Sequence, residues 1–225
     1  MQENIAAKLL EQHRDYAAAE ALVDIEGLSS ARVCRFLNDL VRNMAPEEHY
    51  LEVGTWKGRT LMSAAIDNPG RTCFACDKFR LVGRFTGLGC LAKQELYRNI
   101  ERYQERSARV VFHHTTSARL FREQRIPPPI GVYFYDGDHS FAGTYHGIAS
   151  VEPLLASRAV VLVDDWNDPV IRGATREALR AGTLDVLWER ELEGDHTEIG
   201  WWNGLGVFYV ERRSAGLEPH SIAAQ

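Results

Sequence analysis

Three observations predict that this chain folds as an α/β protein with a doubly wound, mostly parallel sheet. Short runs of β-branched and aromatic residues alternate with stretches of helical period. Carboxylates or a glycine turn follow several of these runs, as is typical of ligand sites at strand ends. The last two runs have no helix between them, so we expect them to pair antiparallel.

The expected elements begin with two helices, Ile5–Ala21 and Ala31–Asn43, the second capped by Ser29 or Ser30. Seven strands follow, and the sheet ends in an antiparallel strand. The expected strands are Tyr50–Val53, Thr72–Cys76, Arg109–His113, Gly131–Tyr135, Val160–Val163, Asp185–Glu189 and Gly206–Glu211. The expected intervening helices are Thr60–Ile66, Leu91–Tyr103, Ala118–Gln124, Gly143–Leu155 and Val170–Ala181.

The length of 225 residues suits one α/β domain with a sizeable core. We expect an N-terminal helical cap over 1–45, the α/β domain over 46–213 and a disordered tail over 214–225. Hydrophobic content of 45% and charged content of 25% are ordinary for a soluble protein. No apolar run reaches the roughly 18 residues of a membrane helix, and the amino terminus lacks a secretory pattern, so a cytoplasmic location is expected.

The charges are unevenly distributed. The net charge of −5 argues mildly against a nucleic-acid partner, yet Lys78 to Arg125 holds eleven Lys/Arg and only four Asp/Glu. This stretch is either a solvated helix surface or a basic rim that attracts an anionic substrate. Cys73 and Cys76 would face opposite sides of one strand, so we interpret them as buried reduced thiols rather than as a metal or disulfide pair.

Three carboxylates end two neighbouring predicted strands. Asp136 follows one apolar run, and Asp164 and Asp165 follow the next. The carboxyl ends of parallel strands meet in one crevice, where crowded carboxylates repel one another unless a proton or cation lies between them. Oxygen ligands favour Mg²⁺, Mn²⁺ or Ca²⁺ over zinc. The sequence therefore predicts a divalent cation held by Asp136, Asp164 and Asp165.

A glycine turn joins the first strand to its helix. Gly54 permits close backbone approach and Gly58 allows the helix to begin beside a ligand, but the turn is neither a GxGxxG fingerprint nor a P-loop. Glu52, next to this turn, would suit a positively charged ligand. Asp77 ends the second predicted strand, where a carboxylate can accept both hydroxyls of a ribose.

These residues resemble a known family. Glu52-x-Gly54-x-x-x-Gly58, with Asp77 after the second strand, is similar to the class I S-adenosylmethionine-dependent methyltransferases, which are Rossmann-like. Tyr135-Asp136-Gly137-Asp138-His139, with Asp164-Asp165-Trp166, resembles the macrocin-type sugar O-methyltransferases and the catechol O-methyltransferase-like enzymes. The resemblance covers roughly Leu51 to Trp166.

The resemblance implies roles in holding S-adenosylmethionine. Gly54, Thr55 and Gly58 would hold its methionine moiety, and Thr60 matches a polar residue near the methionine end. Glu52 stands at the position of the family's motif acid, and Asp136 is also expected among the cofactor-binding residues. Asp77 would bind the ribose and Ser117 the adenine, although the family's frequent Gly-Asp-Ser appears here as Thr115-Thr116-Ser117.

The same resemblance implies the chemistry. Asp136, Asp164 and Asp165 match the family's metal ligands, and His139 stands where relatives place a base, with Asp138 as its rival. The expected acceptor is a hydroxyl of a small molecule with vicinal oxygens, such as a sugar, a catechol or another natural product. Closure by Phe79, Val82, Phe85 and Leu88, hinged at Gly83, Gly87 and Gly89, would exclude water, or these residues pack on the first helices. Trp166, Trp201 and Trp202 would either line an acceptor pocket or pack in the core.

Other functions stay open at this point. The enzyme could lack a metal and use His139 alone on an oxygen or nitrogen. The basic stretch around Arg98, Arg102, Arg106 and Arg109 could serve a nucleic-acid methyltransferase. The chain could also be a non-catalytic cofactor-binding protein. The N-terminal helices would either cover the site or build a homo-oligomer.

Overall fold

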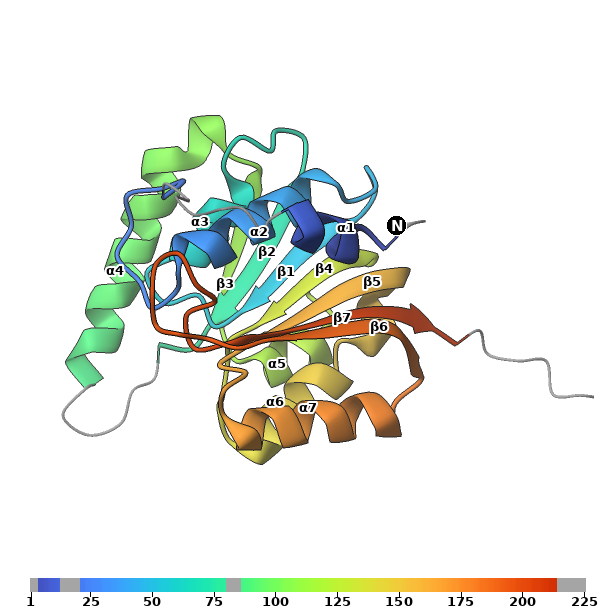
Figure 1. The fold of residues 1–225 in the computed structure, drawn as a ribbon. Helices are drawn as coiled ribbons and strands as arrows, with labels where there is room; N and C mark the ends of the chain where they lie inside the picture. The colour runs from blue at the N-terminus through green and yellow to red at the C-terminus, as the bar shows by residue number, and fades with distance from the viewer. Residues whose placement is uncertain (1–3, 13–20, 80–85, 214–225) are drawn as a thin grey trace, which may run out of the picture.

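A seven-stranded sheet forms the centre of the protein, in the order β3-β2-β1-β4-β5-β7-β6 (Figure 1). This computed structural model describes residues 4–12, 21–79 and 86–213. The strands are β1 His49–Val53, β2 Thr72–Asp77, β3 Arg109–His114, β4 Ile130–Tyr135, β5 Leu155–Asp164, β6 Leu184–Leu192 and β7 Leu205–Arg212. The α-helices are α1 Ile5–Gln12, α2 Ala31–Arg42, α3 Arg59–Ala65, α4 Thr86–Tyr103, α5 Ser117–Arg122, α6 Phe141–Ala149 and α7 Pro169–Ala181.

The predicted mixed sheet is confirmed. Strands β3, β2, β1, β4 and β5 pair parallel, whereas β7 pairs antiparallel with both β5 and β6. The order of the strands reverses between β1 and β4, and a ligand crevice is expected at the carboxyl ends of the strands at such a point. Backbone hydrogen bonds continue past the strand ends on both sides of β1: Asp136 N, after β4, donates to Val53 O at 2.8 Å, and Gly54 N donates to Cys76 O of β2 at 2.9 Å.

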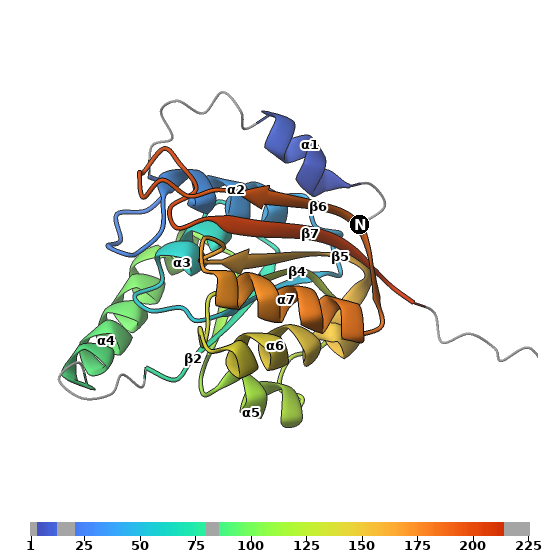
Figure 2. The same cartoon turned by 60° about the horizontal axis from the view of Figure 1, so that its bottom comes forward.

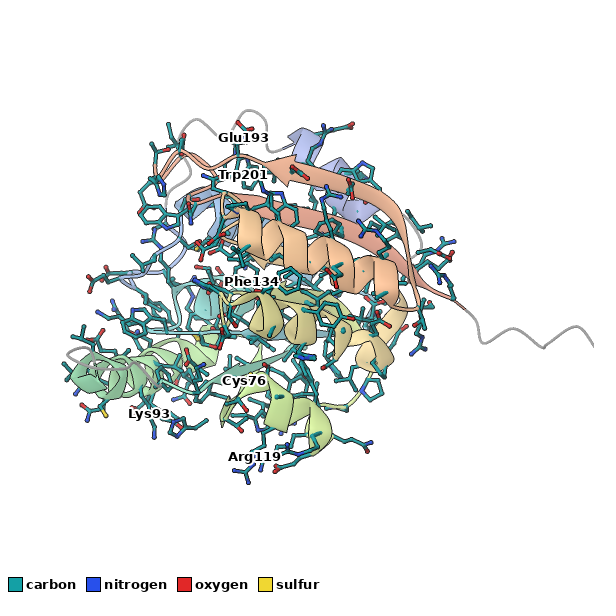
Figure 3. All side chains as sticks on the ribbon, turned by 90° about the horizontal axis from the view of Figure 1, so that it is seen from below. Cys76, Lys93, Arg119, Phe134, Glu193 and Trp201 are labelled. Atoms are coloured by element: carbon teal, nitrogen blue, oxygen red, sulfur yellow. The ribbon has the colours of Figure 1, made fainter. Side chains whose placement is uncertain are left out.

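Helices cover both faces of the sheet. Helices α5, α6 and α7 lie below it, and α1, α2 and α3 lie above it with α4 at one side (Figures 1 and 2). Figure 3 shows the lower layer from below, with Arg119 on α5 directed away from the sheet. Cys73 belongs to the upper core and Cys76 to the lower one, which confirms that the two thiols face opposite sides of β2.

Helix α2 illustrates how local sequence builds a layer. Ser30 is its N-cap and accepts a hydrogen bond from Val33 N at 3.1 Å. Phe36, Leu37 and Leu40 are fully buried on its lower side. This apolar stripe packs α2 against the sheet and fixes the segment that precedes it above the strand ends.

Several predicted boundaries are wrong. Helix α4 begins at Thr86, not Leu91, so Gly87 and Gly89 lie inside a helix. Helix α6 ends at Ala149, and the chain then forms a short 3₁₀ turn at Glu152–Leu154 before β5. A proline in that turn cannot supply the backbone N–H that a continuing helix needs. Strands β5 and β6 are longer than predicted.

Some predictions fall outside the described residues. These are the second half of the first predicted helix, over residues 13–20, the segment 80–85 with Val82, Gly83 and Phe85, and the predicted disordered tail over 214–225. Of the helices in the described part of the chain, none is long and apolar enough to cross a membrane.

Candidate active site

A cavity of about 700 Å³ opens at the carboxyl ends of the strands on both sides of the β1–β4 junction. The turn after β1, the ends of β2 and β3, the β4–α6 loop and the segment before α2 all contribute to its wall. The predicted site residues that line it are Gly54, Thr55, Thr60, Asp77, Ser117, Asp136, Asp138 and His139. Glu52, Gly58, Asp164 and Asp165, although predicted for the site, are not among the residues that line it.

The turn after β1 needs glycine at two positions. Gly54 has φ +86°, and a Cβ built there would lie 1.7 Å from the carbonyl oxygen of Asp136. Gly58 has φ +90°, begins α3 as its N-cap, and a Cβ there would lie 2.6 Å from Leu96 Cδ1. Both positions therefore combine left-handed backbone with a close neighbour, which only glycine tolerates. The first of them brings the β1 turn against the β4–α6 loop.

Asp77 holds the turn in place. Its Oδ2 accepts hydrogen bonds from Thr55 N at 3.0 Å and Trp56 N at 2.8 Å, and its Oδ1 accepts from Phe79 N at 2.7 Å. A carboxylate offers about four acceptor positions, so roughly one remains for a ligand hydroxyl. The predicted ribose-binding carboxylate is thus also the brace that shapes the cavity.

Glu52 lies beneath the cavity and is completely buried. Tyr50 Oη donates to its Oε2 at 2.6 Å, and Thr60 Oγ1 donates to its Oε1 at 3.0 Å. Burial raises the pKa of Glu52 to about 8 in spite of these two hydrogen bonds. The side chain therefore ties β1 to α3 and has no exposed surface for the predicted contact with a ligand.

Two carboxylates and one imidazole converge beside the cavity. His139 Nε2 lies 3.5 Å from Asp136 Oδ1 and 3.2 Å from Asp165 Oδ2. Asp136, His139 and Asp165 can each present a ligand atom within 4.8 Å of the others. Burial raises the pKa of Asp136 to about 6, and the nearby Asp165 acts in the same direction. Such a group of acids is suited to hold a cation or a shared proton.

Asp164 occupies a different position from its neighbour. It is only 4% exposed, and its Oδ1 has no hydrogen-bond partner among the described residues. Burial, with Asp136 and Asp165 close by, raises its pKa well above the ordinary value. A buried carboxylate oxygen without a partner is costly, and a hard divalent cation would satisfy it. Asp164 is not among the residues whose ligand atoms lie within 4.8 Å of one another; in the described part of the chain these are Asp136, His139 and Asp165, a set whose carboxylates suit Mg²⁺ or Mn²⁺.

The two candidate bases differ in their surroundings. A hydrogen bond with Asp136 raises the pKa of His139. Asp138 instead accepts from Ser140 N at 3.0 Å and pairs with Lys78 Nζ at 3.3 Å. The hydrogen bonds from Ser140 lower the pKa of Asp138, which makes its carboxylate a poorer proton acceptor than the imidazole.

Two of the three predicted tryptophans, Trp166 and Trp201, pack in the core, which is one of the two alternatives expected for them. Trp166 is 2% exposed and packs on Phe208 at 5.4 Å between ring centroids, and Trp201 packs edge-on against Phe36 at 5.9 Å. Trp56, which the sequence analysis does not single out, lines the cavity with φ +47°. A bulky residue in the left-handed region is uncommon and marks a constrained site.

The predicted closing segment is described only in part. Phe79, which follows β2, is 9% exposed and lines the cavity, and its ring packs against Phe112 of β3 with 5.9 Å between ring centroids. Leu88 lies in α4 and is exposed. Gly89, predicted as a hinge, is needed for packing, because a Cβ there would lie 2.1 Å from Phe79 O.

The fold and the site together define a class of protein. A sheet of this strand order, a glycine turn after β1 and a carboxylate at the end of β2 are the features of a class I S-adenosylmethionine-dependent methyltransferase. The chain belongs to the methyltransferase domain family, whose model matches residues 51–166. Among curated protein sequences, none matches the chain.

Solved structures support the same fold. An O-methyltransferase from Bacillus cereus, solved with S-adenosylhomocysteine (SAH), is 16% identical with a TM-score of 0.58, over 94% of this chain and 92% of that one. A putative O-methyltransferase from Klebsiella pneumoniae is 16% identical with a TM-score of 0.59, over 94% and 91%. A putative caffeoyl-CoA O-methyltransferase from Staphylococcus aureus is 13% identical with a TM-score of 0.56, over 93% and 100%.

Proposed function

We propose that this methyltransferase moves a methyl group from S-adenosylmethionine to a hydroxyl of a small molecule. A divalent cation would assist at the acidic cluster, which we define as Asp136, Asp164 and Asp165 together with the adjacent His139. The observation that carries the proposal is the convergence of Asp136, His139 and Asp165 beside a cavity shaped by the glycine turn. The similar structures named as O-methyltransferases agree with oxygen as the acceptor atom.

The cofactor would lie along the cavity. Asp77 and Ser117, at the ends of β2 and β3, suit its ribose and adenine, and Gly54 and Thr55 suit its methionine moiety. The sulfonium supplies the methyl group. Asp136, at the end of β4, then lies at the reacting end, where a negative side chain attracts a positively charged sulfur.

The acidic cluster would hold Mg²⁺, Mn²⁺ or Ca²⁺ through Asp136, Asp164 and Asp165. Asp164 brings a buried carboxylate oxygen that lacks a partner in the described part of the chain, and Asp165 approaches from the next position along the backbone. A bound cation supplies Lewis acidity and orients the acceptor. We therefore expect acceptors with vicinal oxygens, such as a sugar, a catechol or a related natural product.

His139 would accept the proton of the acceptor hydroxyl. Its Nε2 lies within reach of both carboxylates, which orient the ring toward the cluster. Replacement by alanine should lower kcat by roughly 10²–10⁴-fold if His139 is the base. A loss smaller than tenfold would favour Asp138.

The test is transfer of labelled methyl groups from S-adenosylmethionine to catechols and sugars with vicinal hydroxyls, with and without a chelator. Asp136→Asn should abolish metal-stimulated transfer while SAH affinity changes much less. Transfer that survives exhaustive chelation would favour the metal-independent alternative. Cofactor binding without transfer to any acceptor would favour a non-catalytic protein.

A nucleic-acid substrate is less well supported. Within the basic stretch, Arg102 pairs with Asp24 at 3.3 Å and Arg106 pairs with Asp67 at 3.0 Å, so these two charges are partly neutralised. The net charge of −5 adds to this argument. We propose a small-molecule substrate, no membrane partner and a cytoplasmic location, with self-association as a further property to measure.

A further inference from the structure

The loop between β6 and β7, residues 193–204, reaches the acidic cluster from a distant part of the sequence. Asn203 Nδ2 donates a hydrogen bond of 2.7 Å to Asp165 Oδ1. The other carboxylate oxygen of Asp165, Oδ2, is the one that lies 3.2 Å from His139. The amide of Asn203 thus holds one oxygen and leaves the second directed at the cluster.

Asp165 needs such support because of its backbone. Strand geometry alone would turn consecutive side chains to opposite faces of the sheet, which would send Asp164 and Asp165 apart. Asp165 adopts φ +55°, and this left-handed conformation brings its side chain back toward His139. A non-glycine residue held in this region persists only where its surroundings fix it.

The loop is anchored on both sides. Toward β5, Trp166 N donates to Gly204 O at 3.2 Å and Asn167 N donates to Asn203 O at 2.9 Å. Toward the upper helices, Glu198 Oε2 accepts from Ala31 N of α2 at 3.0 Å and lies 2.5 Å from Nη2 of Arg59 on α3. Figures 1 and 2 show the loop beside α2, near the carboxyl ends of the strands. Asn203 is therefore presented to Asp165 from a braced backbone.

The chemical type of this partner matters. An arginine or lysine would also orient Asp165, but its positive charge would compete with a cation for the carboxylate. An asparagine amide donates a hydrogen bond without adding charge, so Asp165 keeps its full negative charge for the cluster. Partners behind metal ligands commonly act in this way, and their loss weakens metal affinity by roughly 10–100-fold.

We propose that Asn203 is a positioning residue that orients Asp165 within the Asp136–His139–Asp165 cluster, and that the β6–β7 loop is thereby part of the active site. This inference rests on the cation of the proposed function. It adds a residue that lies 38 positions from the carboxylate it orients and outside the matched family region of 51–166.

The test is the affinity of the full chain for Mn²⁺, measured from the electron paramagnetic resonance signal of the free ion. Asn203→Leu removes the amide at similar volume and should weaken Mn²⁺ binding by roughly tenfold or more. SAH affinity and Tm should stay close to those of the wild type. Thr197→Ala is the matched control, because Thr197 lies in the same loop and the hydrogen bond described for its side chain goes to Asp195, away from the cluster.

The outcomes distinguish failure of the positioning role of Asn203 from failure of the proposed cation. Equal Mn²⁺ affinity in the wild type and Asn203→Leu would overturn the positioning role alone. A wild type that binds no Mn²⁺ would reject the proposed cation and this role with it. Parallel losses of Mn²⁺ affinity, SAH affinity and Tm would show a general structural role instead. If Asn203→Leu does not fold, Asn203→Ala carries the same expectation, and failure of both to fold rejects the role.

Discussion

Replacing Glu52 with glutamine should change how the stability of the protein depends on pH. Glu52 is completely buried, and its carboxylate accepts hydrogen bonds from Tyr50 and Thr60. A glutamine keeps the shape, accepts from one hydroxyl and donates to the other, but does not titrate. The variant therefore isolates the protonation of this one group.

The direction follows from the two pKa values. Burial raises the pKa of folded Glu52 from 4.5 to about 8. Between these values the folded protein keeps the proton and the unfolded chain releases it, so rising pH favours unfolding. The contribution of Glu52 to stability is fully present below pH 4.5 and is lost as pH rises through about 8. The difference between the unfolded and folded pKa of Glu52 corresponds to about 5 kcal/mol of stability, at about 1.4 kcal/mol per pKa unit.

Urea unfolding of both proteins between pH 5.5 and pH 8, with a chelator present, measures the effect. The free energy of unfolding of the wild type should fall relative to Glu52→Gln by about 3 kcal/mol across this range. Glu47→Gln, at an exposed position, controls for the loss of one acidic group. A difference between wild type and Glu52→Gln that stays constant with pH would refute the reasoning, because Glu52 would then be ionised in the folded protein.

Two further predictions concern the cavity. Asp77→Ala should lower the free energy of unfolding by about 2–3 kcal/mol, since three backbone N–H groups lose their acceptor. It should also weaken SAH binding measured by calorimetry, and unchanged SAH affinity would contradict the ribose assignment. Gly54→Ala should lower the free energy of unfolding by at least about 1–3 kcal/mol and abolish SAH binding, because the added Cβ would clash with the carbonyl oxygen of Asp136. Gly70→Ala is its control, since Gly70 shares the positive φ (+80°) but has no neighbour within 4 Å, and equal effects of the two changes on SAH binding would contradict the close-approach argument.

Local patterns were sufficient for most of the fold. Alternating apolar runs and helical stripes predicted all seven strands and the antiparallel β7, because these patterns reflect burial on one or two faces of an element. Helix boundaries were predicted less well. Helix α4 begins at Thr86 and includes Gly89, which packs against the backbone at Phe79, a tertiary contact that helix propensity does not reveal.

The site was predicted in its residue types more than in its geometry. The strand-end rule placed Asp136 at the crevice, but it could not show that Asp165 turns toward His139 while Asp164 stays buried. That difference depends on a single left-handed residue. Glu52 was predicted next to a ligand, whereas the structure surrounds it with hydroxyl groups of Tyr50 and Thr60.

The sequence by itself determined the class of protein, the order of its elements and the acids that end the strands, because each depends on neighbours in the chain. Only the tertiary structure decided which oxygen of Asp165 is held and which is directed at the cluster. The amide that holds it, on Asn203, comes from a loop 38 residues away. No periodicity links two such positions, so their contact exists only once β7 has inserted beside β5 and brought the loop to the strand ends.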